Sequence, residues 1–231
     1  RQMCIRDSSQ SYSYILDTIC SPEERTKILY MWKDDEHLLH RNEYIGEQYN
    51  DFLEKDDEFN FMKVLIANYI LEGIYFYSGF SFFYNLGRNG KMPGTVQEIR
   101  YINRDENTHL WLFRSLINDL RKEREDLFTD DHIKFYMAML KEGVEEEIAW
   151  GKYAIGDNIA GLNGKMVEDY IKYLGNLRAK GLGFDSLYEG YNDVPDSMKW
   201  VEEYADPNQV KTDFFEAKVS AYSKSSIIED D

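Results

Sequence analysis

Proline occurs only four times in the 231 residues of this chain. Because proline interrupts helices, its scarcity leaves long segments free to continue as single helices. Ser21-Pro22-Glu23-Glu24 is typical of a helix start, with Ser21 as the cap and Glu24 able to close a capping box. We therefore predict an all-α fold, with its longest helices over roughly 58–88, 94–122, 129–153 and 163–182.

Glu106 and His109 stand three residues apart within the second of these helices, and Glu72 lies in the first. Residues at i and i+3 share one helical face, so an oxygen and a nitrogen can be aimed at one point. The short glycine-rich connection after residue 88 makes the two helices antiparallel neighbours, which brings the third carboxylate close. This donor set is typical of the metal sites in ferritin-like helical bundles.

The residues that share a face with these acids are apolar. Phe76 and Phe80 follow Glu72 at four and eight residues, while Ile102 and Ile99 precede Glu106 at four and seven. An unpaired carboxylate buried among them would be costly or protonated, and a metal ion would remove that penalty. The alternative is a solvent-exposed helix boundary where Arg104 pairs with Asp105 or Glu106, and the residues alone leave both interpretations open.

Other acid and histidine groups are weaker candidates. Asp34, His37 and His40 lie in the charged segment DDEHLLHRNE, which is typical of a solvated face, and His132 follows two acids at a helix start. In the run Glu145-Glu146-Glu147, consecutive positions point about 100 degrees apart, so at most one of them faces inward.

Composition excludes several functions. A net charge of -16 argues against general electrostatic binding of nucleic acid or anionic membranes. Cys4 and Cys20 show no disulfide framework and suit a reducing cytoplasm. No segment approaches the ~18 apolar residues of a membrane helix.

Four ordered motifs carry a resemblance to a known family. The segment RDExxH, preceded by LExIxFYxxF, is similar to the second half of the metal site in the small, radical-generating (β) subunit of class I ribonucleotide reductase. SYSYILDTI resembles the segment of that subunit with the radical tyrosine, and YIKYLGNLRAKGLGF and the tail TDFFEAKVSAYSK continue the match in order. The resemblance runs from about Ser9 to Tyr222.

The resemblance implies a ferritin-like bundle whose Glu72, Glu106 and His109 bind part of a dinuclear iron, manganese or mixed centre. In the family, this centre oxidises a buried tyrosine, and the radical then passes to a large subunit that reduces ribonucleotides to deoxyribonucleotides for DNA replication. Homodimerisation and docking of the large subunit through the C-terminal tail are further expectations.

Individual roles follow from the same resemblance. Tyr12 matches the radical tyrosine, and Tyr222 matches a tail tyrosine that relays the radical, with Glu216 as a nearby tail acid. Asp105 matches an acid that holds a ligand histidine and joins the transfer path, and Arg104 would neutralise it.

The chain departs from the family pattern near its start. Ile5 and Ser8 stand where the family has its first bridging glutamate and first histidine ligand, and neither binds a hard cation strongly. We therefore expect a fragment that is inactive alone, with a non-native leader over 1–8, an incomplete helical domain over 9–205 and a flexible tail over 206–231. A different ferritin-like dimetal oxidase or oxygenase and an inert helical module are the alternatives.

Overall fold

The structure is a computed structural model that describes the backbone of residues 5–205 and the side chains of residues 8–205. Within this range it contains α-helices, short 3-10 turns and no β-strand, which confirms the predicted all-α fold. The helices are α1 (Ile5–Ile19), α2 (Pro22–Tyr30), α3 (Glu36–Glu54), α4 (Glu58–Gly73), α5 (Tyr77–Arg88), α6 (Pro93–Glu123), α7 (Asp130–Ile155), α8 (Gly164–Gly181) and α9 (Lys199–Ala205), with 3-10 turns at Met31–Lys33, Glu125–Phe128 and Asp196–Met198.

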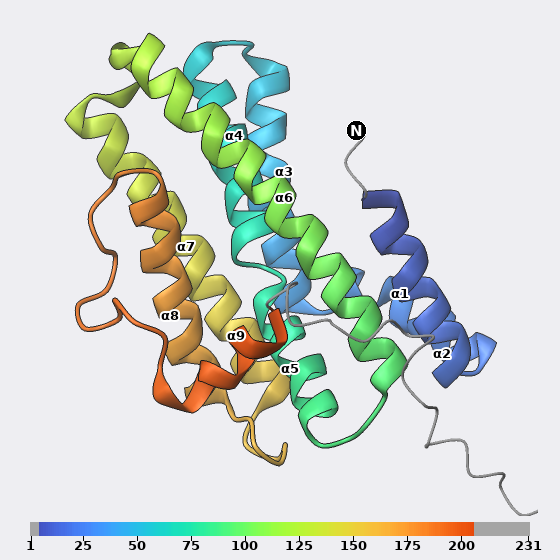
Figure 1. The fold of residues 1–231 in the computed structure, drawn as a ribbon. Helices are drawn as coiled ribbons and strands as arrows, with labels where there is room; N and C mark the ends of the chain where they lie inside the picture. The colour runs from blue at the N-terminus through green and yellow to red at the C-terminus, as the bar shows by residue number, and fades with distance from the viewer. Residues whose placement is uncertain (1–4, 206–231) are drawn as a thin grey trace, which may run out of the picture.

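The long helix α6 runs across the bundle and packs against α4 and α5, while α7 lies beside α8 (Figure 1). Helix α4 also contacts α3 and α7, so it occupies the centre of the bundle. Its side chains Ile66 and Ile70 are fully buried, as are Ile99 and Ile117 of α6 and Leu140 of α7. This shared apolar core fixes the position of α4 relative to α6.

The helix starts predicted from the sequence are confirmed. Ser21 accepts a hydrogen bond from the Glu24 backbone, and the Glu24 side chain completes the capping box. Thr129 caps α7 and Asn163 caps α8 through their side-chain oxygens. These caps satisfy backbone N–H groups that have no partner inside the helix.

The prediction of one helix over 58–88 is wrong, because α4 ends at Gly73 and α5 is a separate helix. Both Ile74 N and Tyr75 N donate to Ile70 O, at 2.9 and 3.3 Å, which widens the last turn of α4. The next helix, α5, begins at Tyr77.

Long-range partners satisfy the backbone groups that the break releases. Arg178 donates from Nε to Gly73 O at 3.0 Å, and Arg41 donates from Nη2 to Tyr75 O at 2.6 Å. Glu147 accepts from Ser78 N at 2.9 Å and forms a buried ion pair with Arg41. Residues of α3, α7 and α8 therefore stabilise the break between α4 and α5.

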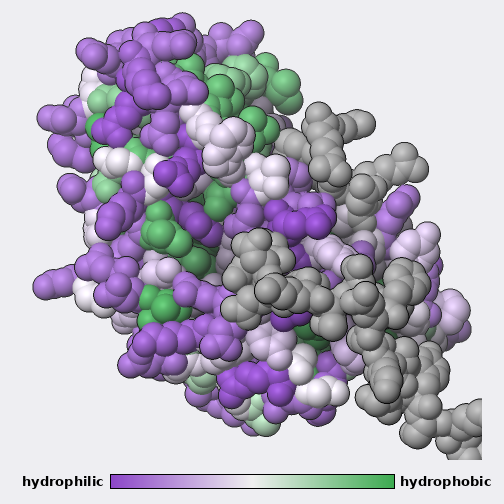
Figure 2. Space-filling model, viewed as in Figure 1, coloured by the Kyte–Doolittle hydropathy of each residue, from purple (hydrophilic) through white to green (hydrophobic). Residues whose placement is uncertain are grey.

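The face shown in Figure 2 is largely hydrophilic, with separate hydrophobic areas. None of the helices between residues 5 and 205 is both long and apolar enough to cross a membrane. The predicted tail over 206–231 lies outside the described residues.

Candidate metal centre

Glu72, Glu106 and His109 meet between the end of α4 and the middle of α6. One donor atom from each lies within 4.8 Å of the others, and the three residues are 3, 5 and 5% exposed. The predicted convergence is confirmed, and the alternative of a solvent-exposed boundary with surface salt bridges is wrong for these residues. Within the described part of the chain this is the single group of three such residues close enough to share a metal ion.

Imidazole Nδ1 is the histidine atom that faces the two carboxylates. It lies 2.8 Å from Glu106 Oε2 and 3.5 Å from Glu72 Oε2. Glu72 Oε2 is buried and has no hydrogen-bond partner. Burial, reinforced by the nearby Glu106 carboxylate, raises the pKa of Glu72 well above its ordinary value.

This arrangement fits a cation. A buried oxygen without a partner is costly, and a metal ion would satisfy it while neutralising two adjacent carboxylates. Two carboxylates and one imidazole are donors that suit iron and manganese. They provide for one metal position, while Ile5 and Ser8 offer no strong ligand at the positions expected for the other half of the site.

A pocket of about 230 Å³ adjoins the cluster and is lined by Tyr12 of α1 together with Glu72 and Glu106. Ser8, Phe76 and Ile102 also line it. Burial, followed by the charge of Glu106, raises the pKa of the Tyr12 phenol. Tyr12, the predicted radical tyrosine, thus lines the same pocket as Glu72 and Glu106, the two carboxylates of the candidate metal site.

The predicted apolar surroundings are present. Phe80, Ile99 and Ile102 are buried, and the rings of Phe76 and Phe80 lie 6.1 Å apart. Phe76 remains beside Glu72 although the helix breaks between them.

Arg104 pairs with Asp105 at 3.1 Å, as expected, and the Asp105 side chain is 31% exposed. Its predicted role in holding a histidine stays a prediction. Glu216 and Tyr222 lie outside the described residues.

The weaker candidates stay apart from the cluster. His40 is exposed and pairs with Glu146 at 3.1 Å, and the His37 ring lies 4.6 Å from the Tyr153 ring. His132 follows the cap of α7 and packs against Phe59. Of the three consecutive glutamates only Glu147 is buried, which agrees with the prediction that at most one faces inward.

Sequence reasoning missed Arg41, which lies in the segment interpreted as a solvated face but is only 7% exposed. A usable signal was present, because Tyr44, Ile45 and Gln48 follow it with helical spacing and are buried on the same side. Arg178 was missed as well. Both arginines support the chain segment that carries Glu72.

The helical bundle and its buried carboxylate and histidine cluster define a ferritin-like protein of the metal-carboxylate class. The chain matches the family "Ribonucleotide reductase, small chain" over residues 8–195. It therefore belongs to the ribonucleotide reductase small-chain family.

Several relatives share this assignment. The chain is 65% identical over 223 residues to "Ribonucleoside-diphosphate reductase subunit beta" of Treponema pallidum, covering 96% of this chain and 64% of that protein. It is 40% identical over 218 residues to the protein of the same name from Halalkalibacterium halodurans, covering 94% and 63%. The structure of a "Ribonucleotide reductase R2 subunit from Clostridium botulinum" superposes with a TM-score of 0.81 at 48% identity, covering 85% of this chain and 62% of that one. The chain thus spans just under two thirds of the length of these relatives.

Proposed function

We propose that this protein serves as the radical-generating small subunit of a class I ribonucleoside-diphosphate reductase. The observation that carries the proposal is the buried Glu72, Glu106 and His109 cluster beside Tyr12, in a chain of the small-chain family. The buried position of the cluster argues against an inert helical module, and the family match argues against an unrelated dimetal oxidase.

In this proposal Glu72, Glu106 and His109 hold one metal of an iron, manganese or mixed pair. When bound and oxidised by O2 or a related oxidant, the metal pair would supply the oxidising power for removing one electron from a tyrosine. Tyr12 keeps its proton at neutral pH, since burial and the charge of Glu106 raise the pKa of its phenol. Oxidation of Tyr12 must therefore release a proton along with the electron. The carboxylates in the same pocket that could receive this proton belong to Glu72 and Glu106.

Phe76 and Ile102 contribute apolar surface to this pocket and limit access of water. A dry environment protects a tyrosyl radical from quenching. Asp105, paired with Arg104, would form part of the hydrogen-bonded path along which the radical leaves the centre. Tyr222, with Glu216 nearby, would relay the radical to a large subunit bound through the tail. We further propose a homodimer in the cytoplasm, where Cys20 would remain a free thiol.

Electron paramagnetic resonance after addition of Fe(II) and O2 tests this function. The samples are this chain, a chimera in which the Treponema pallidum relative supplies everything before its equivalent of Ser9, and the same chimera with Tyr12→Phe. We expect a stable tyrosyl signal only in the unsubstituted chimera, because Ile5 and Ser8 of this chain cannot complete the centre. A signal that survives Tyr12→Phe, or none in the chimera, would refute the proposal.

A further inference from the structure

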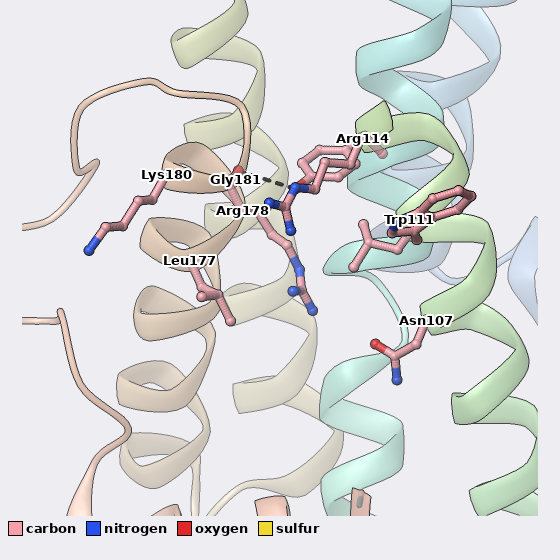
Figure 3. Close-up of a pocket in the computed structure, with 9 residues that line it drawn as sticks. Asn107, Trp111, Arg114, Leu177, Arg178, Lys180 and Gly181 are labelled. Atoms are coloured by element: carbon pink, nitrogen blue, oxygen red, sulfur yellow. Dashed lines mark hydrogen bonds between the residues drawn. The ribbon is translucent and has the colours of Figure 1, made fainter. Parts of the chain in front are cut away.

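A second pocket, of about 450 Å³, lies between α6 and α8, apart from the Tyr12 pocket (Figure 3). Arg114 of α6 and Arg178 of α8 both point into the space between the two helices, whereas Lys180 points away from α6. Asn107 and Trp111 complete the α6 side. Neither the metal cluster nor the proposed radical path uses this pocket.

Arg178 is a buried cation whose contacts are all neutral. It is 9% exposed and donates from Nε to Gly73 O and from Nη2 to Tyr77 Oη, each at 3.0 Å. Its guanidinium also lies 5.3 Å from the Tyr77 ring centre. No carboxylate between residues 8 and 205 forms an ion pair with it. Because a guanidinium stays charged in proteins, this buried charge has no counter-ion among the described residues.

Arg114 adds a second cation that has no ion pair or hydrogen bond within the described chain. Its side chain lies close to Gly181: a Cβ atom placed on that glycine would be 3.6 Å from Arg114 Nε. Burial raises the pKa of the Tyr69 phenol, and the positive charges of Arg178 and Arg114 oppose that rise. Two guanidinium groups thus line the pocket, one from each helix, and arginines hold phosphate oxygens well.

Apolar side chains also line the pocket, Trp111 from α6 and Leu177 from α8. Trp111 is 65% exposed and Leu177 is 42% exposed. An adjoining hollow of about 330 Å³ shares Asn107 and Trp111, so the space extends along α6 beyond the arginines. This space exceeds what an inorganic anion would fill and falls in the size range of small-molecule sites.

We propose that the pocket between α6 and α8 binds a small organic phosphate with a flat ring, its phosphate on Arg114 and Arg178 and its ring against Trp111. General electrostatics cannot supply such binding, since the chain carries a net charge of -16. Specific contacts in the pocket must therefore hold the anion. A mononucleotide has the required phosphate and a ring that can stack on an indole.

Isothermal titration calorimetry of the full chain with AMP, adenosine and orthophosphate tests the proposal. We expect AMP to bind at least ~10-fold more tightly than either of the other two, because it alone has both a phosphate for the arginines and a ring for Trp111. Arg114→Gln should weaken AMP by ~10-fold or more without affecting adenosine, since it removes a charge-assisted contact to the phosphate. Trp111→Ala should weaken AMP and adenosine but leave orthophosphate unchanged.

Lys91→Gln is the matched control, because it removes one exposed positive charge outside the pocket. Arg178 is left intact because it also holds the backbone beside Glu72. AMP binding no tighter than orthophosphate, or an Arg114→Gln variant that binds AMP like Lys91→Gln, would overturn the proposal.

Discussion

Burial strongly alters the chemistry of the Glu72 side chain. It is 3% exposed, and one of its oxygens has no hydrogen-bond partner. Since its pKa is raised, the folded metal-free protein keeps a proton that the unfolded chain releases. Stability therefore falls as pH increases from the ordinary carboxyl range towards the raised value.

Glu72→Gln should make the metal-free protein less sensitive to alkaline pH. The amide cannot ionise, so the loss of stability between pH 5.5 and 8.5 should shrink, and the unfolding temperature at pH 8.5 should rise by roughly 2–4 °C per kcal/mol gained. Thermal unfolding in the presence of a chelator measures this, with the exposed Glu123→Gln as control. An unchanged pH dependence would show that Glu72 is not protonated in the folded state.

At the scale of helices, the break between α4 and α5 positions the metal centre. Gly73 immediately follows Glu72, and its carbonyl is held by Arg178. On the other side of the break, Arg41 and Glu147 bind Tyr75 O and Ser78 N. Glu147 is fully buried, and burial raises its pKa to about 7 although Arg41 and Ser78 oppose the shift.

Arg41→Ala should destabilise the protein by about 3–5 kcal/mol at pH 8, because it leaves the Glu147 carboxylate buried without its partner. The loss should be smaller at pH 6, where a larger fraction of Glu147 is neutral. Urea unfolding at both pH values measures the difference. Lys122→Ala, which breaks an exposed pair with Asp119, should change little. Equal losses from Arg41→Ala at the two pH values would contradict the role assigned to Glu147.

The sequence predicted those helices and ligands whose signals are local. Caps at Thr129 and Asn163 mark helix starts, and the three-residue spacing of Glu106 and His109 places them on one face. The break after Gly73 could not be predicted in this way. Its polar partners lie between 34 and 105 residues away in the sequence, so only the tertiary arrangement shows why the helix stops there.

At the scale of the whole molecule, the proposed function depends on transfer between the buried centre and a second subunit. Tyr222 belongs to an acidic segment outside the described residues, so its role rests on the resemblance of TDFFEAKVSAYSK to the family tail.

Tyr222→Phe in the chimera described above should leave the Tyr12 radical intact and abolish nucleotide reduction with a class I large subunit. Phenylalanine keeps the ring but cannot undergo one-electron oxidation with loss of a proton. Electron paramagnetic resonance measures the Tyr12 radical, and an assay of ribonucleotide reduction on the same samples measures activity. Tyr14→Phe, which changes an exposed tyrosine, is the control. Normal reduction by Tyr222→Phe would exclude the tail relay.

We infer that Glu72, Glu106 and His109 form a metal site. Anomalous X-ray diffraction from crystals of this chain grown with Mn(II) tests it most directly. We predict a manganese peak at coordination distance from both carboxylates and from His109 Nδ1, and no such peak in His109→Ala. Absence of a peak at the cluster in the unsubstituted chain, or manganese held only by other residues, would contradict the account.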